Sequence, residues 1–209
     1  SENILSRNLT KKINNINSIT NTIFNTINNN TNSNTNNVTL FYGSSSTQLI
    51  YNLANGLEKW ISRNNNNEII LNDFNHEACI TPFERIAKKH NLNIHWWSTD
   101  NSYDINYNDL LKKVNQYTSL VVLPHSSNLL GNVIDINYLS KEIKKINANT
   151  LVLVDGVAYF PHDIIDLNND IDYYVISFYK FCGLRVSVLY SDTDNKNIID
   201  NQNHYFFDN

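Results

Sequence analysis

The chain has 209 residues, of which 41% are hydrophobic, so it can build one sizeable α/β domain or two small ones. Its formal net charge of −4 leaves no excess of basic residues of the kind that binds nucleic acid or an anionic membrane. No apolar run approaches the ~18 residues that a membrane-spanning helix requires. We therefore expect a globular protein that engages neither nucleic acid nor membrane.

Residues 1–37 are rich in asparagine, serine and threonine and contain neither glycine nor proline. A segment of this composition buries too little apolar surface to order itself, so we predict that it is partly disordered or a frayed helix. The chain starts at Ser1 and contains no methionine, which favours a fragment of a longer protein. On this interpretation residues 38–192 form the main domain and residues 193–209 begin a truncated C-terminal region.

From residue 38 onward, β-rich runs alternate with runs whose apolar residues have helical spacing. The predicted strands are VTLFY (38–42), EIIL (68–71), NIHWW (93–97), SLVVLP (119–124), TLVLV (150–154), YYVIS (173–177) and RVSVLY (185–190). The predicted helices span 47–62, 82–90, 106–116 and 135–147. This alternation predicts an α/β three-layer sandwich around a mostly parallel sheet of about seven strands. The last two strands are too close for a crossover helix, so the final strand is predicted to be antiparallel.

Ligands of such sheets bind beyond the carboxyl ends of the strands, so the residues that follow each strand are the candidates for a site. The turn from Gly43 to Thr47 precedes a helix, where free N–H groups and the helix dipole favour an anion. An ordinary Ser/Thr helix cap would have the same sequence. His76 follows the second strand and Asn128 the fourth. Each could orient a ligand, or could be a surface histidine and a turn-stabilising asparagine.

Asp155 closes the apolar run LVLV, and Lys180 follows YYVIS and two aromatic residues. A carboxylate at a buried strand end must be solvated, paired or in contact with a cationic ligand. Neighbouring strands lie ~4.8 Å apart, so the two ends could hold an acid and an amine around one aromatic ring, or could form a structural ion pair. A phosphate on the Gly43 turn, a ring beside His76, a ring nitrogen on Asp155 and an aldehyde on Lys180 together describe pyridoxal 5′-phosphate.

Six sequence blocks in this order and spacing resemble the class V aminotransferase family of fold-type I pyridoxal-phosphate enzymes. The blocks are GSSST, DFNHEACITPFERIAK, HSSNLLGNVIDI, VLVDGVAYFPHDIIDL, DYYVISFYK and VSVLY. Within the family they are most similar to the cysteine desulfurase-like branch. The resemblance implies the large cofactor-binding domain without the small C-terminal domain, a homodimer, and a small amino-acid substrate.

The resemblance also implies roles for individual residues. Lys180 matches the Schiff-base lysine, Asp155 the aspartate that keeps the pyridine nitrogen protonated, and His76 the histidine stacked on the ring, and these three form the catalytic set. The remaining cofactor-binding positions are Asn128, beside the phenolic oxygen, and the phosphate contacts Ser44, Ser45, Ser177 and Tyr179. The implied function is the cofactor-binding portion of a pyridoxal-phosphate-dependent transferase or lyase.

The chain departs from the family pattern at three positions. Ala158 stands where glutamine is frequent, Tyr179 where histidine often precedes the lysine, and Leu184 where proline often follows the glycine. The first two departures also resemble the desulfurase-like branch. A non-catalytic homologue or interaction module that keeps the fold is the alternative. A nucleotide-binding domain is disfavoured, because neither G-x-G-x-x-G nor a Walker loop is present.

The two cysteines, Cys79 and Cys182, are too few and too far apart for a disulfide framework or a paired-cysteine metal site. They favour reduced thiols in an intracellular, cytoplasmic protein. We expect both thiols to be buried and inert. Cys182 in particular lies in a short link between two core strands, next to Phe181 and Leu184, which suggests an apolar setting.

Overall fold

The computed structural model describes residues 38–63, 67–192 and 198–200, so the predicted segment 1–37 and most of 193–209 lie outside the described residues. The chain divides into two compact units. Residues 164–168, which have no regular secondary structure, belong to the unit that includes the N-terminal segment. The other described residues belong to the second unit, which contains the sheet, and the following description concerns that unit.

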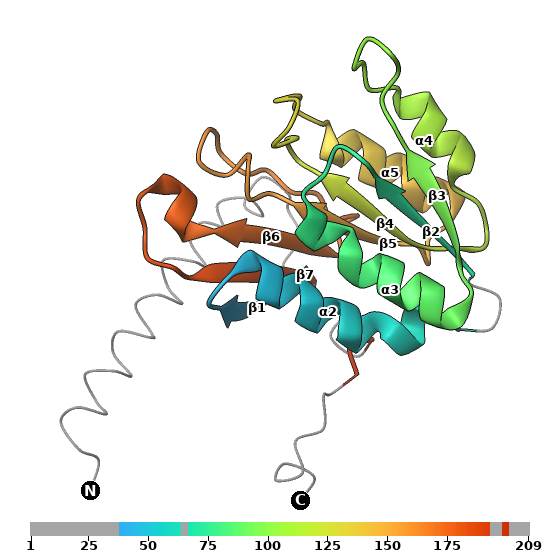
Figure 1. The fold of residues 1–209 in the computed structure, drawn as a ribbon, viewed down its shortest axis with the longest axis horizontal. Coiled ribbons are helices and arrows are strands. Elements are labelled where there is room, and N and C mark those ends of the chain that lie inside the picture. Colours follow the sequence, from blue (N-terminus) through green and yellow to red (C-terminus); the bar gives the residue numbers. More distant parts are fainter. Residues whose placement is uncertain (1–37, 64–66, 193–197, 201–209) are drawn as a thin grey trace, which may run out of the picture. The chain divides into compact units, whose positions relative to one another are not determined.

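Seven strands of the described ranges form one sheet, in the order β1-β7-β6-β5-β4-β2-β3 (Figure 1). They are β1 (Val38–Gly43), β2 (Glu68–Asn72), β3 (Asn93–Trp97), β4 (Thr118–Pro124), β5 (Leu151–Asp155), β6 (Tyr173–Ser177) and β7 (Ser187–Asp192). The pairs from β3 through β2, β4 and β5 to β6 are parallel. β7 is antiparallel to both β6 and β1. The predicted mostly parallel sheet with an antiparallel last strand is confirmed.

Helices cover both faces of the sheet, with α2 and α3 on one face and α4 and α5 on the other (Figure 1). Their bounds are α2 (Ser46–Ile61), α3 (Thr81–His90), α4 (Tyr107–Lys113) and α5 (Ile136–Ile146). Two 3₁₀ turns, η1 (Glu77–Cys79) and η2 (Phe178–Phe181), follow β2 and β6. The predicted three-layer sandwich is therefore confirmed.

The helix boundaries follow from capping residues. Ser45 precedes α2 in an extended conformation, and its hydroxyl accepts a hydrogen bond from the Gln48 N–H at 3.1 Å. α3 ends where Asn91 adopts a left-handed conformation with φ of 55°. The predicted helix 106–116 is wrong at both ends, because Asn106 caps α4 from outside and Val114 is already extended.

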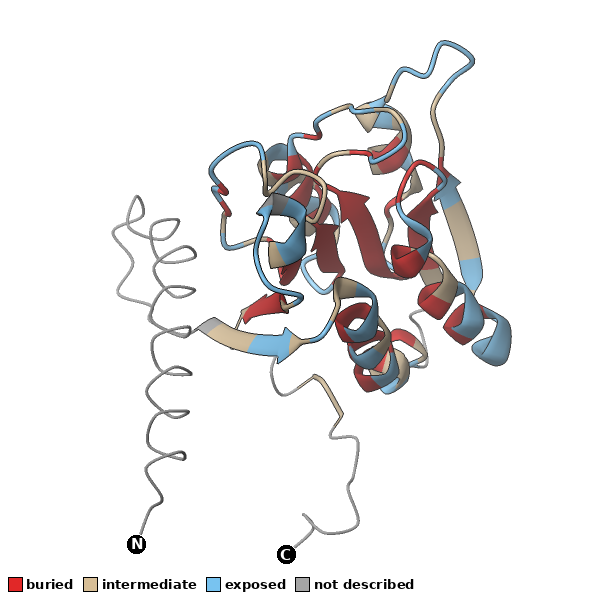
Figure 2. Ribbon diagram, turned by 60° about the vertical axis from the view of Figure 1, so that its left-hand side comes forward, coloured by how far each residue is buried: buried red, intermediate tan, exposed pale blue. Residues whose placement is uncertain are grey.

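The core lies between the sheet and its two helical layers. Side chains of alternate strand residues point to opposite faces, so the continuous burial of β4 and β5 reflects cover on both sides. Leu120, Leu153 and Val175 point toward α2 and α3, where they pack against Leu53 and Phe83. Each such side chain contributes about 1.5–3 kcal/mol when fully buried. Figure 2 shows the central strands as buried and the edge strands β1 and β3 as partly exposed. Among the described residues, no helix is long and apolar enough to cross a membrane.

Candidate active site

The strand register brings the candidate residues to one edge of the sheet. Asp155 is the last residue of β5 and pairs with Pro124, the last residue of β4. Gly43 at the end of β1 and Ser177 at the end of β6 both pair with Ser187, the first residue of the intervening strand β7. The Gly43 turn, Ser177 and Asp155 therefore lie at the same end of the sheet, as predicted for parallel strands.

The Gly43 turn places two serines at the start of α2. The Ser44 N–H and hydroxyl both donate to Gln48 Oε1, at 3.1 and 2.8 Å, and Ser45 is the helix cap described above. Gly43 permits this turn because a Cβ atom at that position would lie 2.8 Å from the Leu49 side chain. The start of this 16-residue helix presents backbone N–H groups and a positive dipole end, the combination that holds phosphates.

Ser177 lies across β7 from the Gly43 turn, and we call the edge of the sheet between them the Gly43–Ser177 corner. Its side chain is buried and accepts a hydrogen bond from the Ser187 hydroxyl at 2.8 Å. The sequence did not single out Ser187, because its contact depends on the pairing of β7 with both β1 and β6. The three predicted phosphate-binding serines thus lie on two strand ends that share one neighbouring strand.

Asp155 is buried, with 7% of its surface exposed, and both carboxylate oxygens have partners. Oδ1 accepts the Val157 N–H at 3.0 Å, and Oδ2 lies 3.1 Å from the Cys79 thiol, which donates to it. Burial raises the pKa of the Asp155 carboxyl, while these two hydrogen bonds and the electrostatic interactions with His76 and Lys180 act in the opposite direction. Asp155 is therefore oriented by the protein, and two candidate site residues are close enough to affect its pKa.

His76 lies at the start of η1, directly after the loop that follows β2. Its ring Nδ1 accepts a hydrogen bond from the Ala78 backbone N–H at 3.1 Å, and the His76 backbone N–H donates to Asn75 Oδ1 at 2.7 Å. The side chain of His76 is exposed. His76 is thus an exposed residue that caps η1, and it lies close enough to Asp155 to affect the pKa of that carboxyl.

Lys180 belongs to η2 and is exposed. Its Nζ lies 5.7 Å from the centre of the Tyr179 ring, within the range of a weak cation–π contact. Lys180 also lines a cavity of about 560 Å³. The other lining residues come from the loops after β4 and β5: Ser126, Ser127, Asn128, Gly131, Val133, Ala158, Tyr159, Pro161, His162 and Asp163. The cavity is large enough for a small ligand, and it brings two predicted site residues, Asn128 and Lys180, together.

Asp155 and Lys180 do not form the structural ion pair that was the alternative interpretation. Within the described residues, the Asp155 carboxylate bonds to Cys79 and Val157, and no ion pair joins it to Lys180. The lysine is thus accessible from the cavity, while the carboxylate is held by the fold. An acid at the end of β5 and an amine in the turn after the adjacent parallel strand β6, without an ion pair between them, are suited to a ligand that contacts both.

Sequence reasoning missed a buried histidine behind this site. His125 directly follows β4. Its backbone N–H donates to the Asp155 backbone carbonyl oxygen at 2.8 Å, and its ring Nδ1 lies 2.7 Å from Tyr174 Oη. Its ring stacks on Tyr159, with ring centres 3.5 Å apart. Burial lowers the pKa of His125 to about 4. No local signal distinguishes His125, because Tyr174 and Tyr159 come from later parts of the chain.

The two cysteines differ in their environment. Cys79 is fully buried, as predicted, whereas Cys182 is exposed, so the prediction of a buried Cys182 is wrong. Cys182 follows η2 in a left-handed conformation with φ of 65°, and the nearby Leu184 is 75% exposed. The link between β6 and β7 extends beyond the sheet edge. Its apolar sequence therefore does not imply burial.

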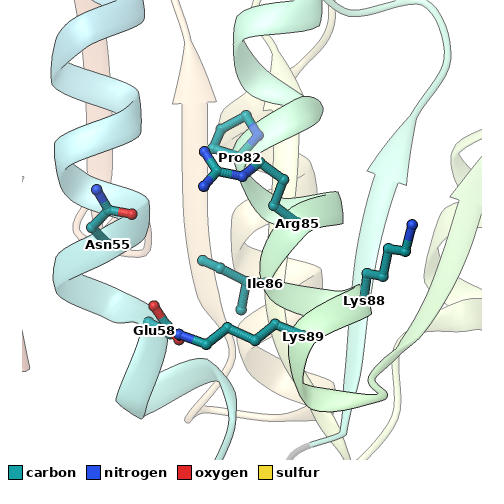
Figure 3. A pocket seen from close by; sticks show the side chains of 7 residues that line it. All are labelled: Asn55, Glu58, Pro82, Arg85, Ile86, Lys88 and Lys89. Atoms are coloured by element: carbon teal, nitrogen blue, oxygen red, sulfur yellow. The ribbon is translucent and has the colours of Figure 1, made fainter.

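A cavity of about 350 Å³ lies away from the strand ends, between α2 and α3 (Figure 3). In Figure 3 the carboxylate of Glu58 faces the ammonium of Lys89, and these groups are 2.6 Å apart. Hydrogen bonds from Lys89 and His90 lower the pKa of Glu58. Arg85 and Lys88 also line this groove. None of the candidate residues that follow the strands lines this cavity.

Comparison with known proteins agrees with this architecture. The profile of the family "Aminotransferase class-V" matches residues 3–201. The chain therefore belongs to the class V aminotransferase family, whose members are pyridoxal-phosphate enzymes. The resemblance to this family that the sequence blocks carried is confirmed.

Among its relatives, the aminotransferase-like protein FGM3 of Gibberella zeae is 32% identical over 167 residues, which cover 78% of this chain and 40% of that protein. A probable cysteine desulfurase of Mycoplasma genitalium is 35% identical over 147 residues, 69% of this chain and 35% of that protein. The solved structure of the cysteine desulfurase CsdA from Escherichia coli superposes with a TM-score of 0.75 at 18% identity, covering 95% of this chain and 48% of that one. This likeness shows the fold, and the chain spans less than half the length of these relatives.

The residues at the strand ends have the chemistry that pyridoxal 5′-phosphate requires. Asp155 offers a buried carboxylate for a protonated ring nitrogen, and Lys180 offers an amine inside a cavity. The α2 terminus and its serines offer N–H and hydroxyl donors for a phosphate. The donor set therefore fits the family's cofactor.

Proposed function

We propose that this chain is the cofactor-binding portion of a pyridoxal-phosphate-dependent enzyme that acts on small amino acids, in the cysteine desulfurase-like branch of its family. Residues 38–192 would form the cofactor-binding domain, flanked by segments 1–37 and 193–209. The observation that carries the proposal is the contrast at the ends of β5 and β6. A buried carboxylate without an ion-pair partner in the described chain lies next to a lysine that lines an open cavity.

In this proposal Lys180 holds the cofactor covalently through Nζ. Asp155 accepts a hydrogen bond from the protonated ring nitrogen, with lone pairs that Cys79 and Val157 do not use. His76 lies against the ring with its exposed face. When bound, the cofactor would supply an electron sink for chemistry at the Cα atom of the amino acid.

The phosphate would lie in the corner formed by Ser44, Ser45, Ser177 and Tyr179. Ser44 and Ser45 lie at the N-terminus of α2. The Ser177 hydroxyl accepts a hydrogen bond from Ser187, which fixes its position. Asn128 lines the same cavity as Lys180 and would orient the phenolic oxygen. Lys180 Nζ, when not attached to the cofactor, is placed to take and return a substrate proton from within the cavity.

The family and the surface around the cavity support a homodimer as the working form. Leu129, Val133 and Leu184 are 60% or more exposed, and Val133 lines the cavity mouth. Apolar side chains beside an open site are suited to contact with a second subunit. The two free cysteines support a reducing, cytoplasmic location.

The test is covalent labelling of Lys180. The purified chain is incubated with pyridoxal 5′-phosphate, its visible absorption is recorded, and the adduct is fixed with borohydride for peptide mapping. We expect a yellow protein with the label on Lys180, and no label at that site in Lys180→Ala. Lys88→Ala, which changes an exposed lysine far from the strand ends, is the matched control and should label like the wild type. Label on another residue, or a folded chain that takes up no cofactor, would favour the non-catalytic homologue.

A further inference from the structure

Cys79 makes a contact that its expected role as an inert core residue does not include. It ends the 3₁₀ turn η1, three residues after His76, and the turn is closed by the Cys79 N–H bond to the His76 carbonyl oxygen at 2.9 Å. This turn directs its fully buried Sγ to Asp155 Oδ2, at 3.1 Å. Cys79, in the turn after β2, thus touches the carboxylate that ends β5, on the other side of β4.

The direction of this hydrogen bond is defined by the chemistry of the two groups. Burial, and then the negative charge of Asp155, raise the pKa of the Cys79 thiol well above its usual range, so the sulfur keeps its proton. A neutral thiol beside a carboxylate is the donor, and a hydrogen bond to an ionised acceptor is stronger than one between neutral groups. Cys79 is therefore a permanent donor to Oδ2.

The donor has two consequences for Asp155. With the Val157 N–H on Oδ1 and the thiol on Oδ2, each oxygen is engaged once, so the plane of the carboxylate is fixed and each oxygen keeps lone-pair density for another donor. Burial raises the pKa of Asp155, whereas the Val157 N–H, the thiol and the electrostatic interactions with His76 and Lys180 lower it and so favour the ionised carboxylate. These groups come from η1, η2 and the loop after β5.

We propose that Cys79 is a positioning residue that acts through Asp155, fixing the plane and the charge that this carboxylate presents to a cationic aromatic ring. The proposal rests on the proposed function, because the ring nitrogen of pyridoxal phosphate is the group that Asp155 would hold. It gives a specific role to a fully buried thiol that does not line the cavity.

A double-mutant cycle on cofactor affinity separates positioning from packing. The dissociation constant of pyridoxal 5′-phosphate is measured for the wild type, Cys79→Val, Asp155→Asn and the double variant. We expect Cys79→Val to weaken binding about tenfold, a typical effect of losing a hydrogen bond to a charged group, and less than about twofold in the Asp155→Asn background. Equal losses in both backgrounds would mean that Cys79 acts through packing alone, and the proposal would fail.

Two further variants control this experiment. Cys79→Ser keeps a hydroxyl donor in the same place and should bind within about threefold of the wild type. Cys182→Ser changes the exposed thiol and should leave affinity unchanged. Circular dichroism identifies any variant that does not fold. If only Cys79→Val misfolds, the comparison of Cys79→Ala with Cys79→Ser replaces it.

An infrared measurement tests the contact without cofactor. The difference spectrum between the wild type and Cys79→Val isolates the S–H stretching band of Cys79, which should be displaced to lower frequency by its ionised acceptor. The band should move to higher frequency in Asp155→Asn. If the wild type takes up no cofactor but the band responds, the proposed function fails and the thiol–carboxylate contact stands. A band that is the same with and without Asp155 overturns the inference itself.

Discussion

The ends of β5 and β6 lie side by side in the sheet, yet the charged residues at or just after these ends differ in burial. Asp155 is buried and held by a backbone N–H and a thiol. Lys180 is exposed, and its described contact is a long one to the Tyr179 ring. Asp155 is thus part of the buried interior, whereas Lys180 lines the cavity. Changes around Asp155 should therefore affect stability as well as ligand binding, whereas changes at Lys180 should affect ligand binding alone.

The largest effect should come from the residue that follows Asp155. A Cβ atom at Gly156 would overlap the Tyr174 ring, whose hydroxyl is anchored by His125 and cannot move aside easily. We expect Gly156→Ala to lower the free energy of unfolding by about 3 kcal/mol. Gly43→Ala is the graded control, since its Cβ would meet the flexible Leu49 side chain, and it should cost about 1 kcal/mol. Urea denaturation measures the free energy of unfolding of both variants. Equal losses would contradict the inference that the Tyr174 ring beside Gly156 is rigidly held.

The next effect depends on pH and concerns His125. Its pKa is lowered by burial to about 4 from an ordinary value of 6.5, so the unfolded chain binds a proton between these values that the folded chain does not. Stability should therefore fall as the pH is lowered from about 6.5 to 4, by about 3 kcal/mol for this group. In His125→Gln this part of the pH dependence should be lost. An unchanged profile in the variant would show that the pKa of His125 is not lowered in the folded protein.

The smallest effect concerns how much the buried Asp155 carboxylate lowers the stability of the folded chain. Burial raises the pKa of Asp155, so its ionised form reduces stability as the pH rises above the carboxyl's unfolded value of about 4. Without cofactor, Asp155→Asn should be more stable than the wild type at pH 7 by on the order of 1 kcal/mol, and the gain should vanish near pH 3. Lys180→Ala is the matched control and should stay within about 0.5 kcal/mol. A destabilised Asp155→Asn at pH 7 would assign the carboxylate a structural role.

Much of the fold could be predicted because its signals are local. Runs such as SLVVLP and TLVLV are typical of strands covered on both faces, and the spacing of Leu49, Leu53 and Leu57 predicts a helix. The short link after β6 also predicted an antiparallel β7, which the structure confirms. The error at residues 106–116 arose because Val114 continues an apolar pattern while its backbone is extended.

The arrangement of the site was predictable in part. The rule that ligands bind at the carboxyl ends of parallel strands was enough to select Asp155, Lys180 and the Gly43 turn. It could not identify the partners of these residues, because Cys79, His125 and Ser187 reach them through contacts between distant segments. The exposure of Cys182 was missed for the opposite reason: apolar neighbours suggested burial where no other described element covers the turn.

The position of β7 between β6 and β1 has a consequence for synthesis on the ribosome. Gly43 and Ser177 acquire their common neighbour only when Ser187 has been made. At about 5–20 residues per second, the chain needs on the order of ten seconds to grow from Gly43 to that point. During this time β1 has no strand to pair with, and the anion-binding turn is not yet anchored to the sheet. The corner that would receive the phosphate is thus among the last parts of the domain to assemble during translation.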